Sequence, residues 1–160
     1  MPILHPSMKD YLSKHISDVC NSEYNNDKIN HCAHFVSHVL GYQFGFTCKD
    51  MTGKGDEGVC IRVHELFSRC PKIGYWKDLV EKEKNHLVFI TDASNVNIAT
   101  KTIRNIPKKH VGIYSDKHIY HYSNSKDKVV KQTPEQFSKH YRGNNITMYY
   151  GTLPMAATKS

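Results

Sequence analysis

Hydrophobic residues in the first half of the chain recur at the three-to-four-residue spacing of amphipathic helices. Residues 7–20 have this spacing behind a serine cap, which predicts a helix that covers the core. A shorter apolar stripe over residues 32–40 predicts a second helix, with Asn30 as its N-cap and Gly41 at its end. A third stripe predicts a helix over residues 59–70.

The second half of the chain follows the patterns of strands. Two β-rich runs flank a polar break at residues 115–117, which predicts a hairpin over residues 110–123. Thr133, followed by proline and later by glutamine, predicts a short capped helix. Helices first and a meandering antiparallel sheet afterwards predict the α+β class. Further strands are predicted at residues 87–90, 98–103, 128–131 and 146–151.

The register of the hairpin decides which of its side chains share a face. A two-residue turn at residues 116–117 makes His110 and His121 diagonal neighbours on one face. A three-residue turn would instead bring Asn124 onto that face. We expect the two-residue turn and keep Asn124 as the alternative.

The length of 160 residues fits one domain with a core of its own. We expect a single catalytic domain over residues 1–160, in which residues 41–86 form an insertion beside the cleft and residues 154–160 a loose tail. The hydrophobic fraction of 39% and the charged fraction of 23% are typical of globular proteins. No apolar run reaches the length of a membrane span.

The formal net charge of +7 fits either an anionic partner or a solvated basic surface. Lysine and arginine are spread along the chain, and no nucleic-acid-binding motif accompanies them, so we expect neither a nucleic acid nor a membrane as partner. The first residues lack the basic-then-apolar pattern of a secretory signal. We therefore expect synthesis in a cytoplasm, with any export by another route.

The five cysteines are an odd number, so at least one thiol has no partner of its own kind. If Cys32 is set aside as a candidate nucleophile, four cysteines remain: Cys20, Cys48, Cys60 and Cys70. These four form two disulfides in an oxidising compartment or remain buried thiols. Cys60 and His64 have the spacing of two metal ligands on one helix, but no C-x-x-C pair supports them. The sequence therefore predicts no metal ion and no cofactor.

Cys32 falls in the first turn of its predicted helix. Unpaired backbone N–H groups and the positive end of the helix dipole favour a thiolate there, and the same N–H groups can hold an oxyanion. A cysteine, a histidine that takes its proton and a polar group that orients the histidine form an activated nucleophile. The alternative is that Cys32 is a buried core cysteine.

These motifs resemble the NlpC-type cell-wall endopeptidases and the related amidases of papain-like fold. The catalytic Cys of that family opens a helix in a Cys-small-x-Phe/Leu-Val pattern, which Cys32-Ala33-His34-Phe35-Val36 matches. Its catalytic His opens a strand reading His-Val-Gly-Ile-Tyr, which residues 110–114 match without a gap. Its third polar residue lies on the following strand, where His121 falls. The resemblance covers residues 28–42 and 86–153.

Two departures from the family pattern lie beside the nucleophile. Asn30-His31 stands where the family has an aspartate before the Cys, and His34 replaces a small residue. Both bear on substrate preference more than on the nucleophile.

The resemblance implies a papain-like fold, with the catalytic-Cys helix packed on an antiparallel sheet. It also implies a cysteine amidase that cleaves peptidoglycan stem peptides beside D-configured residues, typically between D-glutamate and diaminopimelate. Cys32 would be the nucleophile, His110 the base and His121 the residue that orients it.

The small size, basic charge and lack of wall-anchoring repeats resemble the amidase effectors that type VI-like secretion systems inject into rival bacteria. The expected partners are then the stem peptide and a cognate immunity protein. The expected state is a monomer, delivered to the periplasm of the target. A phage lysin is the alternative source.

Two other classes of function remain open. The same Cys-His pair serves acyltransferases and thioesterases that act on lipid or protein acyl groups. In a non-catalytic binding module for an anionic polymer, Cys32 would be part of the core.

Overall fold

The computed structural model describes residues 8–155, which divide into two compact units. Within these residues, unit 1 comprises 8–62, 121–130 and 155, and unit 2 comprises 63–120 and 131–154. The expected single catalytic domain stays a prediction. Most of the tail expected at residues 154–160 lies outside the described residues, as do residues 1–7.

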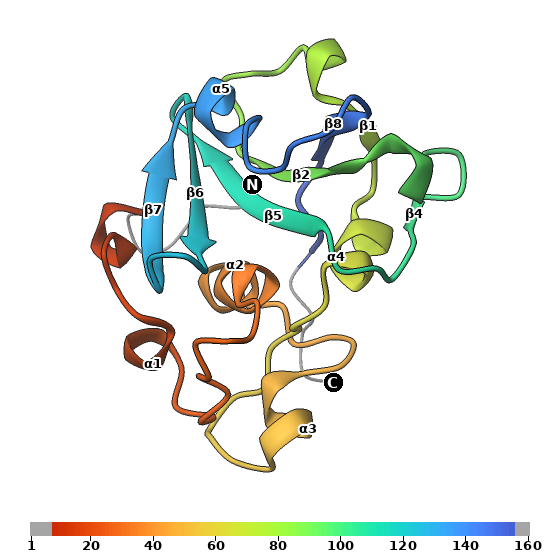
Figure 1. The fold of residues 1–160 in the computed structure, drawn as a ribbon. Helices are drawn as coiled ribbons and strands as arrows, with labels where there is room; N and C mark the ends of the chain where they lie inside the picture. Colours follow the sequence, from red (N-terminus) through yellow and green to blue (C-terminus); the bar gives the residue numbers. More distant parts are fainter. Residues whose placement is uncertain (1–7, 156–160) are drawn as a thin grey trace. The chain divides into compact units, whose positions relative to one another are not determined.

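A six-stranded sheet is the main β-structure of the chain, and its strand pairs of known register are antiparallel (Figure 1). The α+β class is therefore confirmed. Its strands, in spatial order, are β1 (Ile73–Tyr75), β8 (Ile146–Gly151), β2 (His86–Asp92), β5 (Lys109–Ser115), β6 (His118–Ser123) and β7 (Lys128–Gln132).

Strand β2 is the centre of unit 2, because it pairs with β5 on one side and β8 on the other. Six of its seven residues are buried, which is why residues 87–90 read as a continuous apolar run. Val88 and Ile90 pack with Tyr114 of β5 and with Phe137 of α5 (Pro134–Phe137). Helix α5 begins at the predicted cap, where Thr133 and Gln136 bond each other's backbone N–H groups.

The turn between β5 and β6 has two residues, as predicted. Ile113 lies opposite Tyr120, and Ser115 lies opposite His118. Asp116 and Lys117 both have positive φ, 50° and 67°, which matches the primed turns that suit the twist of a hairpin. The three-residue turn is therefore wrong.

The helix predicted over residues 7–20 is wrong. Two short helical pieces occupy this segment: η1 (Met8–Tyr11) and α1 (Ile16–Val19). Ser13 between them has φ 66°, and its backbone N–H donates to the carbonyl of Val129, whose own N–H donates to Lys14. Backbone pairing with a distant strand has replaced the helical bonds that the local pattern favours.

Residues 41–86 contain several elements that the patterns did not predict. Besides β1 they are α3 (Cys48–Thr52) and η2 (Trp76–Asp78). The helix predicted over residues 59–70 is shorter, α4 (Val63–Arg69). The strand predicted over residues 98–103 is wrong: η3 (Ala93–Asn95) leads into a separate small hairpin of β3 (Val96–Asn97) and β4 (Thr102–Ile103). No helix among the described residues is long and apolar enough to cross a membrane.

His86 of β2 makes the stability of unit 2 depend on pH. Its side chain is 3% exposed, and its Nδ1 lies 2.9 Å from the carbonyl oxygen of Lys84. Burial lowers the pKa of His86 below its usual value, although the Lys84 carbonyl partly raises it. The unfolded chain therefore takes up this proton first as the pH falls. The stabilisation is complete above about pH 6.5 and is lost as the pH falls toward the lowered pKa.

We expect the free energy of unfolding to fall more steeply between about pH 7.5 and about pH 5.5 in the wild type than in His86→Phe. The difference in slope should be at most about 1.4 kcal/mol per pH unit, the value for one proton. Urea unfolding at several pH values measures it. Parallel pH dependences of the two proteins would contradict the assignment.

Candidate functional site

Cys32 is the first residue of α2 (Cys32–Leu40), a helix of unit 1 that Gly41 ends in the left-handed conformation. The helix position is as predicted, but its N-cap is His31 rather than Asn30. Asn30 still serves this helix end, because its Oδ1 accepts the backbone N–H of Cys32 at 2.9 Å. Seven of the nine residues of α2 are buried, and Cys32 is 1% exposed.

The bond between Asn30 and Cys32 changes the expected oxyanion site. The backbone N–H of Cys32 would have to release the side-chain oxygen of Asn30 before it could donate to a substrate oxygen. Asn30 therefore occupies the place that an oxyanion would take at this group.

His31 is a buried residue that sequence reasoning did not single out as functional. Its backbone N–H donates to Asn124 Oδ1 at 3.2 Å, and its ring Nε2 lies 2.9 Å from the carbonyl oxygen of Asn26. Burial lowers the pKa of His31, and the Asn26 carbonyl partly raises it. Asn124, kept as an alternative catalytic residue, thus binds the residue before Cys32.

His110 lies in β5 of unit 2, opposite Ile90 of β2. It is fully buried. Its ring stacks on the ring of His140, with centroids 4.1 Å apart and planes 12° apart, and Phe137 lies 5.7 Å away. His140 follows α5 in the chain, and no pattern in the sequence connects it with His110. This histidine pair is a feature that sequence reasoning missed.

His121 lies in β6 and is 2% exposed. It belongs to unit 1, as Cys32 does, whereas His110 belongs to unit 2. The two-residue turn within unit 2 gives the hairpin the register on which the choice of His121 rests.

Four side chains of unit 1 form a cluster that the sequence analysis did not predict: Cys20, His34, His38 and Cys48. One ligand atom from each lies within 4.8 Å of all the others. Cys20 is the C-cap of α1, the histidines lie one turn apart on α2, and Cys48 opens α3. The spacing of His34 and His38 is a signal that could have found the site.

The electrostatics of the cluster favour a thiolate at one of its two sulfurs. A hydrogen bond from Cys20 holds the pKa of the Cys48 thiol far below its usual range, against the effect of burial, and His34 and His38 lower it further. The same bond, together with burial, raises the pKa of the Cys20 thiol, so Cys20 carries the shared proton. Burial lowers the pKa of His34, partly offset by Cys48. Metals bind the neutral form of histidine and the thiolate form of cysteine, and the lowered pKa values of His34 and Cys48 favour these forms.

Cys60 and His64 do not share a helix, because α4 begins only at Val63. Cys60 precedes that helix and lies in a bridge with Thr47. The prediction that one helix carries both Cys60 and His64, as a shared metal site would need, is therefore wrong. None of the five cysteines is in a disulfide in the structure.

Comparisons with protein-family models, with curated proteins and with solved structures find no match for this chain.

Proposed function

We propose that this chain is a cysteine amidase that hydrolyses peptide-stem bonds of bacterial peptidoglycan, with a papain-like arrangement of its catalytic residues. The observation that carries the proposal is the position of Cys32, the first residue of a buried helix. Helix N-termini lower the pKa of a thiol and supply N–H groups to an oxyanion. The register of the β5–β6 hairpin and the His-Val-Gly-Ile-Tyr string support it.

In the proposed mechanism, His110 takes the proton of the Cys32 thiol, and the sulfur attacks the carbonyl carbon of the stem amide. The tetrahedral intermediate collapses when His110 returns the proton to the leaving amine. A water molecule, deprotonated by His110, then hydrolyses the thioester and restores Cys32. During both attacks, the Cys32 N–H would release Asn30 Oδ1 and donate to the oxyanion instead.

The place of action follows from the location of the substrate. Peptidoglycan lies outside the cytoplasmic membrane, so we propose that the protein acts in the periplasm of target bacteria as an antibacterial effector. A cognate immunity protein would then cover the catalytic residues. The net charge of +7 would favour contact with an anionic wall.

A non-catalytic binding module is the second candidate, because Cys32 is only 1% exposed. Alkylation by iodoacetamide at neutral pH distinguishes the two. The amidase proposal expects Cys32 to react before Cys60 and Cys70, and loss of hydrolysis to follow its modification. A Cys32 that stays unmodified while the protein is folded would favour the binding module.

His121 is proposed to orient His110, so His121→Ala should lower kcat by about 10- to 100-fold with little change in KM. His121→Asn should recover part of kcat, because an amide can also accept or donate the orienting hydrogen bond. His118→Ala, on the same strand, is the matched control. Rates on purified stem peptides measure these effects.

Asn124→Ala is a second control for the role given to His121. It removes the acceptor of the His31 N–H and should affect stability more than kcat. A loss of kcat in Asn124→Ala and none in His121→Ala would contradict the role given to His121.

A further inference from the structure

We propose that Cys20, His34, His38 and Cys48 bind one Zn²⁺ ion that stabilises unit 1. Two cysteines and two histidines are a common ligand set of structural zinc, which takes four ligands in a tetrahedron. The proposal goes beyond the hydrolytic function and does not depend on it.

The distance between the two sulfurs fits a shared zinc ion. Cys20 Sγ and Cys48 Sγ are 3.8 Å apart. A disulfide would require about 2.05 Å. Two sulfurs that each lie about 2.3 Å from a tetrahedral zinc are about 3.8 Å apart. The pair is therefore already spaced as two ligands of one ion.

Hydrogen bonds of the histidine rings aim a lone pair of His34 at the cluster. The backbone carbonyl of Asn26 can only accept a hydrogen bond, so His31 Nε2 carries a proton and donates to it. With a single proton on its ring, His31 accepts at Nδ1, where it meets His34 Nδ1 at 3.2 Å. His34 Nδ1 is thus the protonated nitrogen, and its Nε2 carries the lone pair. Such an outer partner, which fixes the tautomer, is typical of metal-bound histidines.

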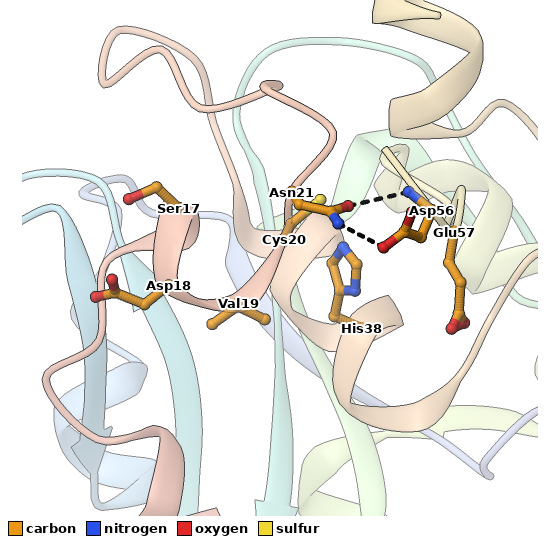
Figure 2. Close-up of a pocket in the computed structure, with 8 residues that line it drawn as sticks. All are labelled: Ser17, Asp18, Val19, Cys20, Asn21, His38, Asp56 and Glu57. Atoms are coloured by element: carbon orange, nitrogen blue, oxygen red, sulfur yellow. Dashed lines mark hydrogen bonds between the residues drawn. The ribbon is translucent and has the colours of Figure 1, made fainter. Parts of the chain in front are cut away.

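The Nε2 atoms of both cluster histidines are buried and have no hydrogen-bond partner among the described residues. A buried nitrogen without a partner is costly, and zinc would satisfy both atoms. Figure 2 shows the His38 ring directed toward Cys20 and Asn21, at the wall of a pocket of about 300 Å³. This pocket gives an ion a route to the cluster from solvent.

Ser22 places two hydrogen-bonding groups against the sulfur of Cys20. The backbone N–H of Ser22 donates to Cys20 Sγ at 3.3 Å, and the Ser22 hydroxyl lies 2.9 Å from the same sulfur. Ser22 is fully buried. Donors of this kind stabilise the negative charge of a metal-bound sulfur.

Four protein ligands close the coordination of zinc, so the ion would be structural rather than catalytic. It would tie the end of α1 and the start of α3 to the middle of α2. The apolar cluster at this place is small, with Cys20, Cys48 and Val59 as its buried members. Zinc would therefore supply stability that this region does not gain from apolar packing.

Metal content and unfolding of the purified full chain test the site. We expect about one zinc ion per chain by elemental mass spectrometry. Removal by a chelator should lower Tm by about 10 °C or more, and added Zn²⁺ should restore it. Cys32→Ala should keep its zinc, which separates this proposal from the hydrolytic one. A metal-free wild type whose Tm does not respond to Zn²⁺ would overturn it.

Cobalt identifies the ligands. Co²⁺ added to the metal-free wild type should give the visible bands of a tetrahedral site and the near-ultraviolet band of thiolate-to-cobalt charge transfer. Cys48→Ser should lose about half of the charge-transfer intensity, since one of two thiolates is removed. Cys60→Ser and Cys70→Ser are the matched controls and should keep it.

Two outcomes would overturn the assignment without any variant. One is a wild-type cobalt spectrum that lacks the thiolate band. The other is wild-type protein, purified with reductant and excess Zn²⁺, in which iodoacetamide alkylates Cys20 and Cys48 as fast as in the metal-free protein. Both remain decisive if the Cys48→Ser protein does not fold.

Discussion

Cys32→Ala is expected to lower the rate of stem-peptide hydrolysis by about 10⁴-fold or more, because the remaining groups cannot form the thioester. His110→Ala should cost about as much, since a thiol without its base is a poor nucleophile. The double variant should be no slower than either single one, because nucleophile and base act as one unit. Hydrolysis rates of purified stem peptides measure all three.

The control for this prediction is a cysteine of the same burial away from the proposed mechanism. Cys60→Ala removes a thiol that is also buried, and it should leave kcat near that of the wild type. Circular dichroism of each variant checks the fold. A Cys32→Ala protein that is folded and retains near wild-type hydrolysis would contradict the mechanism.

Fusion to an export signal is expected to make the protein lytic in a Gram-negative host, whereas the bare chain should be tolerated. The difference follows from the place of the substrate, which lies across the membrane from the site of synthesis. The net charge of +7 should help the exported protein hold to the anionic wall, and added salt should weaken that attraction by screening. Optical density and viable counts after induction measure lysis.

Lysis by the exported protein should require Cys32, so the exported Cys32→Ala protein is the control. Equal toxicity of the bare and the exported chain would point to a target in the cytoplasm. A protein or acyl substrate, as for the acyltransferases and thioesterases that use the same residue pair, would then fit better than peptidoglycan.

Local patterns predicted those elements whose structure is determined locally. The residues of β8 match the predicted strand 146–151, and α5 begins at its capping box. The two-residue turn at Asp116 and Lys117 also follows from nearby residues, since two β-rich runs flank it and aspartate tolerates positive φ. The hairpin turn, the helix cap and the alternation of side chains along a strand each depend on a few neighbouring residues.

Elements that depend on distant partners were not predictable in this way. Ser13 and Lys14 bond Val129 of β7, and these bonds interrupt a helix that the hydrophobic spacing favours. Strand β1 has only three residues and exists through its pairing with β8. Neither pairing leaves a pattern in the residues nearby.

The candidate site was predictable only in part. Cys32 opens its helix as expected, but the bond between its N–H and Asn30 depends on a cap displaced by one residue. The stacking of His140 on His110 joins β5 to the residues after α5, which no spacing reveals. The cluster of Cys20, His34, His38 and Cys48 draws on three helices, and only the spacing of His34 and His38 leaves a signal in the sequence.

Digestion of purified sacculi, with the fragments identified by mass spectrometry, tests the central claim most directly. The wild type should release fragments that all end at one amide bond of the stem peptide, with a new carboxylate on one side and a new amine on the other. Folded Cys32→Ala should release none of them. Intact sacculi after prolonged incubation with wild-type protein, or the same fragments from both proteins, would contradict the claim that this chain is a peptidoglycan amidase with Cys32 as its nucleophile.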